Sequence, residues 1–191
     1  DHFVSYPILK AHAKKYGPMT LIQFDAHCDT WTDDGKRFDH GTMFARAANE
    51  GIIDVTKSTQ IGLRTYNDTD YGFEILTSPW VHRNGIQAAI EIALKRAEDT
   101  PVYLSFDIDG LDPAFAPGTG TPVCGGLASW QGLEFVRALE PLNLIGMDIV
   151  EVSPAYDTAE ITALAAANIA YDWIALIAKK NGAPCSFVGK I

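Results

Sequence analysis

The chain has 191 residues, of which 47% are apolar and 20% are charged, and this composition is sufficient to bury the core of one domain. The formal net charge of −9 comes with no basic stripe, which argues against a nucleic-acid-binding protein. The three cysteines, Cys28, Cys124 and Cys185, are odd in number and form no C-x-x-C pair, so we expect the protein in a reducing cytoplasm.

Strand-like and helix-like segments alternate along the chain. Strands are predicted over residues 19–25, 59–64, 73–76, 102–108 and 144–151. Helices are predicted over residues 6–15, 42–49, 87–98, 130–139 and 159–180, with Ser129 and Thr158 as N-caps. Such alternation predicts an α/β fold, in which a mostly parallel sheet is covered by helices on both faces to give three layers, α/β/α.

The last predicted helix is the most apolar segment of the chain. Only eleven residues separate Glu160 from Asp172 without a charge, which is too few to cross a bilayer. We therefore expect a buried, Ala-rich helix and no membrane partner.

Two of the predicted strands end in acidic residues or histidine at every second position. Asp25, His27 and Asp29 end one of them, and Asp107 and Asp109 end the other. Side chains two apart on a strand point to the same face, so each set should project together, at the edge where parallel sheets bind ligands. Carboxylates crowded in this way are costly to bury unless cations neutralise them. The pattern therefore predicts a metal site.

The ligand types narrow the choice of metal. Many oxygens with a minority of imidazole favour Mn²⁺ or a similar ion over zinc or calcium. Four carboxylates carry more charge than one divalent ion balances, so a two-ion site with bridging carboxylates fits better. One D-x-H-x-D motif alone would fit a solvated strand end, but the second acidic motif argues against that interpretation. Cys28 falls on the opposite face in this alternation and is expected to be packed.

Four segments of the chain resemble the ureohydrolases, the arginase and agmatinase family, and most closely the bacterial agmatinases. They are FDAHCD, FDHGTMF, SFDIDGLDPAFAPGTGTPVCGG and MDIVEVSPAYD. The resemblance implies an arginase/deacetylase-like form of the predicted fold. It also implies a single domain over residues 1–191 that lacks the N-terminal portion of the family, and assembly of the full-length protein into trimers or hexamers.

The resemblance also implies two Mn²⁺ ions per subunit and assigns their ligands. His2 and Asp29 would belong to one ion, and His27 and Asp109 to the other. The remaining two ligands, Asp25 and Asp107, would bridge the ions.

The catalytic candidates are His40, Glu151 and Asp29. Glu151 resembles the family glutamate that holds the guanidinium by charge-assisted hydrogen bonds, and His40 resembles the histidine that handles the proton. The implied reaction is hydrolysis of agmatine, a small cationic guanidino substrate, to putrescine and urea. Two alternatives stay open: a related guanidino-acid hydrolase, such as a guanidinobutyrase or an arginase-like enzyme, and a catalytically silent homologue or fragment.

Three more polar residues are expected to support the site. Asp112, before Pro113, should fix the shape of its loop or make a hydrogen bond behind the ligands. Asp148 lies one residue out of step with Glu151 and is expected to pair with a cation elsewhere. Thr121 is expected to face the substrate.

Overall fold

The structure, a computed structural model, describes residues 1–32, 35–36 and 39–183. At its centre is a five-stranded sheet in the order β3-β2-β1-β4-β5, with every neighbouring pair parallel. The strands are β1 (Thr20–Phe24), β2 (Thr59–Ile61), β3 (Glu74–Leu76), β4 (Pro101–Asp107) and β5 (Asn143–Val150). Phe38 of the FDHGTMF segment and Cys185 lie outside the described residues, and Cys28 and Cys124 are free thiols.

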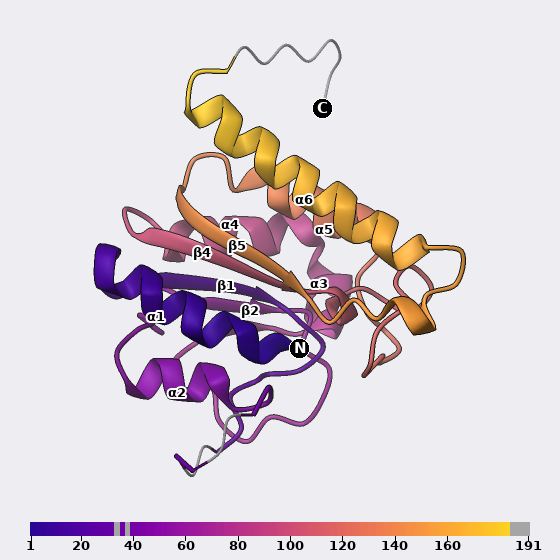
Figure 1. Cartoon of the computed structure of the whole chain (residues 1–191), viewed down its shortest axis with the longest axis horizontal. Helices are drawn as coiled ribbons and strands as arrows, with labels where there is room; N and C mark the ends of the chain where they lie inside the picture. The colour runs from indigo at the N-terminus through magenta and orange to yellow at the C-terminus, as the bar shows by residue number, and fades with distance from the viewer. Residues whose placement is uncertain (33–34, 37–38, 184–191) are drawn as a thin grey trace.

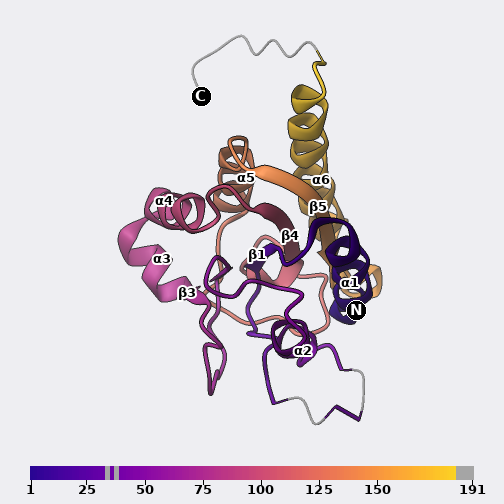
Figure 2. The same cartoon turned by 90° about the vertical axis from the view of Figure 1, so that its left-hand side faces the viewer.

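Helices cover both faces of the sheet, as Figures 1 and 2 show. One face carries α1 (Ser5–Tyr16) and α2 (Met43–Asn49), and the other carries α3 (Ser78–Asn84), α4 (Ile86–Arg96), α5 (Ser129–Ala138) and α6 (Ile161–Lys180). The part of the chain that the structure describes also holds three short 3-10 turns, η1 (His2–Val4), η2 (Ile108–Gly110) and η3 (Pro154–Tyr156). The predicted three-layer α/β/α fold is confirmed.

The two central strands divide their side chains between two cores. Phe24 of β1 and Phe106 of β4 stack with ring centroids 4.7 Å apart, in the core beneath α4, α5 and α6. Leu21 and Tyr103, on the opposite face, pack against α1 and α2. All four are fully buried, and burying an apolar side chain of this size stabilises the fold by about 1.5–3 kcal/mol.

Most of the acidic residues lie beyond the strands rather than within them, although Asp107 is the last residue of β4. β1 ends at Phe24, so Asp25 and its neighbours follow in a loop, and Asp109 lies in η2. Asp29 has a left-handed backbone with φ of 52°. The strand alternation that we expected to align these residues was therefore wrong. The loop after β1 and the turn η2 bring Asp25, Asp29 and Asp109 to Asp107, which stands at the end of β4.

The predicted helix starts were also wrong in detail. The N-cap of α5 is Ala128, whose N–H donates to Gln131, and Ser129 is the first helical residue. α6 begins at Ile161 with Glu160 in the N-cap position. The side chain that accepts from the N–H groups of Thr162 and Ala163 belongs to Asp157, not Thr158. The short helix α3 was not predicted, although Thr77 accepts a hydrogen bond from the N–H of Trp80 in the way that an N-cap does.

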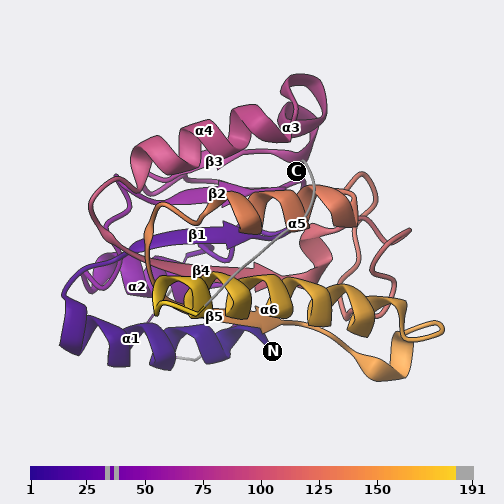
Figure 3. The ribbon, with the colours of Figure 1, turned by 90° about the horizontal axis from the view of Figure 1, so that it is seen from above.

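α6 is buried on one side only, which corrects the expectation of a buried helix. It lies beside α5 along the sheet, as Figure 3 shows, with Trp173 and Leu176 turned inward and Leu164 and Tyr171 exposed. By length and composition α6 could cross a membrane, but the core helix of a soluble protein passes the same test, so this is weak evidence.

Candidate metal centre

The acidic residues gather at the carboxyl ends of β1 and β4, where the N-terminal residues also lie (Figures 1 and 3). This is the edge at which parallel α/β sheets bind ligands. Asp25, Asp29, Asp107 and Asp109 are all buried there, none more than 6% exposed. Burial of so much negative charge at one edge needs compensation by positive charge.

The first group of donors surrounds the imidazole of His2. Its Nδ1 atom lies 2.8 Å from Asp29 Oδ2, 3.1 Å from Asp25 Oδ2 and 3.2 Å from Asp107 Oδ2. Although buried, Nδ1 forms no hydrogen bond of acceptable geometry with any described residue. Ligand atoms that share one ion at about 2 Å lie roughly 3 Å from each other. The orphaned nitrogen and its three oxygens therefore fit a divalent cation.

A second group lies directly beside the first and shares Asp25 with it. His27 Nδ1 is 3.2 Å from Asp109 Oδ2 and 3.4 Å from Asp25 Oδ1. Asp25 thus presents one carboxylate oxygen to each group. Asp107, the other expected bridge, turns Oδ2 toward His2, while its Oδ1 accepts a hydrogen bond from the N–H of Asp109.

The crowding of these buried side chains shifts their pKa values. Burial, together with the charge of Asp25, raises the pKa of Asp29 to about 7 and that of Asp107 well above its usual value. Burial opposes the charged form of His27, but hydrogen bonds to Asp109 and Asp25 raise its pKa to about 10. Without a cation the cluster therefore keeps protons, which metal binding would displace.

Glu151 and His40 lie at the mouth of the first group. Glu151 follows β5 with a left-handed φ of 63°, a conformation that costs free energy in a residue other than glycine or asparagine. Its Oε1 accepts the N–H of His2 at 2.6 Å and lies 3.8 Å from His40 Nδ1. Glu151 is therefore anchored, whereas the imidazole of His40 is 56% exposed.

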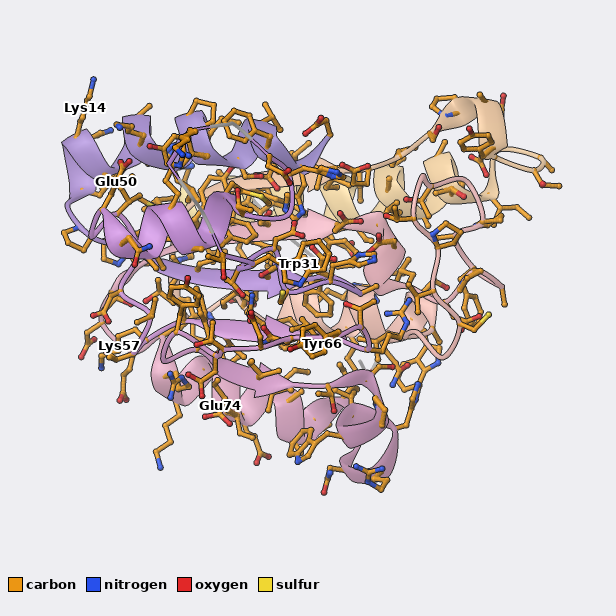
Figure 4. The ribbon with its side chains drawn as sticks, turned by 90° about the horizontal axis from the view of Figure 1, so that it is seen from below. Lys14, Trp31, Glu50, Lys57, Tyr66 and Glu74 are labelled. Carbon is orange, nitrogen blue, oxygen red and sulfur yellow. The ribbon has the colours of Figure 1, made fainter. Side chains whose placement is uncertain are left out.

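Two aromatic side chains border the same loops. Trp31 Nε1 donates to the carbonyl of Tyr66 at 3.3 Å, and the Trp31 ring meets the His27 ring edge-on at 6.5 Å. Figure 4 shows Trp31 and Tyr66 near each other, whereas Lys14 and Lys57 lie toward the starts of the strands.

Arg64 is a half-buried cation that the sequence interpretation missed. Its guanidinium donates to five backbone carbonyls, those of Gly62, Asp109, Gly110, Leu111 and Val123. It thereby ties η2, which carries Asp109, to the later loop that contains Val123. An arginine after a short strand gives no sequence signal for this role, because four of its five partners are backbone carbonyls distant in the chain.

The three supporting residues have different outcomes. Asp112 accepts the N–H groups of Ala114, Gly125 and Gly126, so it fixes the loop as expected. Thr121 donates to Asp109 Oδ2 at 3.0 Å, beside the cluster. The expectation for Asp148 was wrong among the described residues, because its carboxylate accepts hydrogen bonds from the hydroxyls of Tyr103 and Ser105 and pairs with no cation there.

A parallel α/β sheet with histidines and aspartates gathered at its carboxyl edge defines a class of α/β proteins with candidate divalent-cation sites. The chain's family follows from comparison with known proteins. The model of the arginase family matches residues 1–175, and the chain belongs to that family.

Similar proteins agree with this assignment. The chain is 56% identical to an agmatinase of Chromobacterium violaceum and 56% identical to an agmatinase of Proteus mirabilis, each match covering 95% of this chain. It spans 57% and 59% of the lengths of those two relatives.

Solved structures agree as well. A hypothetical agmatinase from Burkholderia thailandensis superposes with a TM-score of 0.93 at 55% identity, covering 96% of this chain and 59% of the other. An arginase from Bacillus caldovelox gives 0.84 at 28% identity, covering 91% of this chain and 66% of the other. The arginase-like form of the fold is thus confirmed.

Proposed function

We propose that the protein is a binuclear manganese amidinohydrolase that hydrolyses the guanidinium group of agmatine to putrescine and urea. The observation that carries the proposal is the buried Nδ1 atom of His2, which faces three carboxylate oxygens without a hydrogen bond to any described residue. The agmatinases at 56% identity support the choice of substrate. Assembly into trimers or hexamers, and a cytoplasmic location, stay predictions.

The metal ligands in this proposal follow the two donor groups. One ion would be held by His2, Asp25, Asp29 and Asp107, and the other by Asp25, His27 and Asp109. A pair of divalent ions supplies Lewis-acid activation of a water nucleophile near neutral pH. The chemistry needs this help because the positive charge of a guanidinium is delocalised and its carbon is a poor electrophile.

Glu151 and His40 would act on the substrate. The second oxygen of Glu151 is free of the contact that anchors Oε1 to His2, so this carboxylate would orient the guanidinium by charge-assisted hydrogen bonds. His40 lies beside it and is open to solvent, and its imidazole would carry a proton to the departing amine. Asp29, the third catalytic candidate, would hold the first ion against His2.

Manganese analysis combined with a urea-release assay on the intact protein tests the proposal. We expect two Mn²⁺ per chain and urea from agmatine. A Glu151→Gln variant keeps the shape of the side chain and is expected to keep its metal while losing most of kcat/KM for agmatine. Failure of the metal-loaded protein to release urea from any guanidino compound would reject the proposal.

Rates on agmatine and on guanidinobutyrate separate the proposed substrate from the guanidino acids. We expect agmatine to be preferred. A clear preference for the acid would replace agmatinase activity with that of a guanidino-acid hydrolase, and metal binding without any turnover would favour the catalytically silent homologue.

A further inference from the structure

A row of polar side chains crosses the sheet directly beneath the metal centre. Gln60, Gln23, Ser105 and Asp148 occupy matching register positions on β2, β1, β4 and β5. Gln23 and Ser105 alternate with the large apolar residues of the core beneath α4, α5 and α6, so they point to the opposite face of the sheet. We call these four residues the polar row.

One arm of the polar row ends at His2. Ser105 Oγ donates to Asp148 Oδ1 at 2.7 Å, and the hydroxyl of Tyr103 donates to Asp148 Oδ2 at 2.9 Å. His2 Nε2 lies 2.7 Å from Ser105 Oγ, and Ser5 Oγ lies 3.5 Å from Ser105 Oγ.

The direction of these hydrogen bonds is forced by the carboxylate. An ionised carboxylate only accepts, so the single proton of Ser105 is used toward Asp148. Ser105 Oγ must then accept the N–H at Nε2 of His2. A neutral imidazole with its proton on Nε2 leaves the lone pair on Nδ1, the atom that faces the three carboxylate oxygens.

The other arm ends at Asp25. Gln60 Nε2 donates to Gln23 Oε1 at 2.6 Å and to the carbonyl of Cys28 at 2.7 Å. Since Gln23 Oε1 is occupied as an acceptor, its amide nitrogen is turned to Asp25 Oδ2, to which it donates at 2.8 Å. This arm holds the one carboxylate that both donor groups share.

We propose that the polar row positions the metal ligands, with Asp148 and Ser105 fixing the tautomer and orientation of His2 and with Gln60 and Gln23 fixing the carboxylate of Asp25. The inference rests on the proposed function, because it assumes that the cluster binds cations. Hydrogen-bond partners of this kind change metal affinity by about 10- to 100-fold when they are removed. The two arms should differ, because His2 belongs to one donor group and Asp25 to both.

Calorimetric titration with Mn²⁺ tests the two arms against each other. We expect Ser105→Ala and Asp148→Asn to lower the affinity for one Mn²⁺ ion by about 10- to 100-fold and to leave the affinity for the other unchanged. The double variant should lose no more than the stronger single variant, because both substitutions break the same chain of hydrogen bonds. Gln23→Met should lower the affinity for both ions. In electron paramagnetic resonance, the Ser105→Ala protein at one equivalent of Mn²⁺ should show an isolated ion.

Ser58→Ala is the matched control. Ser58 is also a fully buried serine with two hydrogen bonds, to the N–H of Leu21 and the carbonyl of Asp54, but it lies at the opposite end of the strands. We expect it to leave both Mn²⁺ affinities unchanged.

The possible results separate the inference from the proposed function. A wild-type protein that takes up no Mn²⁺ would overturn both. If the wild type binds two ions and Ser105→Ala and Asp148→Asn bind them with the same affinities, the inference alone fails. Equal weakening of both ions in Ser105→Ala, with a lower melting temperature than Ser58→Ala, would mean a general loosening of the fold and would also overturn it.

Discussion

Neighbouring residues on the same two strands serve different purposes on the two faces of the sheet. Phe24 and Phe106 stack in the core beneath α4, α5 and α6, where every member of the cluster is apolar. Gln23 and Ser105, one residue earlier in each strand, face the opposite side and contact Asp25 and His2. At this level of the sheet, one face is purely apolar and the other carries the polar row, so stability and metal binding should be separable by mutation at these positions.

The largest expected effect comes from the apolar face. Phe106→Ala should lower the free energy of unfolding by about 3–5 kcal/mol, because it removes a buried ring and leaves a cavity. Urea unfolding of the metal-free protein measures it. Ser105→Ala, the adjacent residue, should cost far less stability while weakening Mn²⁺ binding. A smaller loss in Phe106→Ala than in Ser105→Ala would break the comparison.

The next largest loss of stability is expected from a substitution in the loops near the metal centre. A Cβ atom at Gly126 would lie 2.5 Å from the backbone nitrogen of Asp112 and 2.7 Å from Arg64 Nη2, so Gly126→Ala should cost about 1–3 kcal/mol. Among the described residues, a Cβ atom at Gly120 would meet only Glu151 Oε2, at 3.9 Å, so Gly120→Ala is the control. Thermal unfolding of the pair measures the difference, and equal melting temperatures would contradict the close packing at Gly126.

A smaller effect is expected where α6 begins. Asp157 accepts the N–H groups of Thr162 and Ala163, each at 2.9 Å, as an N-cap carboxylate does. Asp157→Ala should therefore lower the melting temperature by a few degrees, and Thr158→Ala should leave it nearly unchanged. The opposite ranking would restore Thr158 as the cap that its sequence position suggested.

The smallest effect is a change in pH dependence. Burial alone would raise the pKa of Asp112, but three backbone N–H groups and Arg64 lower it below its usual 3.8. The stabilisation is complete at neutral pH and is lost as the pH falls below about 3.8, through the pKa of the folded state.

The Asp112→Asn variant tests this sign. We expect it to be less stable than the wild type at pH 7, with the difference in unfolding free energy shrinking as the pH falls toward 3. A difference that grows in acid would contradict the hydrogen bonds to Asp112.

Much of the fold could be predicted because it depends on local patterns. Apolar runs located the five strands, and their alternation with helices predicted the parallel sheet. Helix boundaries were less certain, because both Asp157 and Thr158 are good capping residues and only the backbone geometry chooses between them.

The candidate site was predictable only where acidic residues mark it. Asp25 and Asp107 stand out at the ends of apolar runs, so their convergence could be expected: Asp25 directly follows β1, and Asp107 ends the neighbouring strand β4. Gln23 and Ser105 gave no such signal, since uncharged polar residues within strands are common. Their role depends on the strand register, which places Gln23 opposite Ser105 and is not visible in either segment alone.

Anomalous diffraction at the manganese edge, from crystals of the protein grown with Mn²⁺, tests the central claim most directly. Two ions should appear about 3.5 Å apart, as in other two-metal sites. One should lie between His2 Nδ1 and the oxygens of Asp29 and Asp107, and the other beside His27 and Asp109. A map with no manganese at Asp25, or with these carboxylates turned away from each other, would contradict the account.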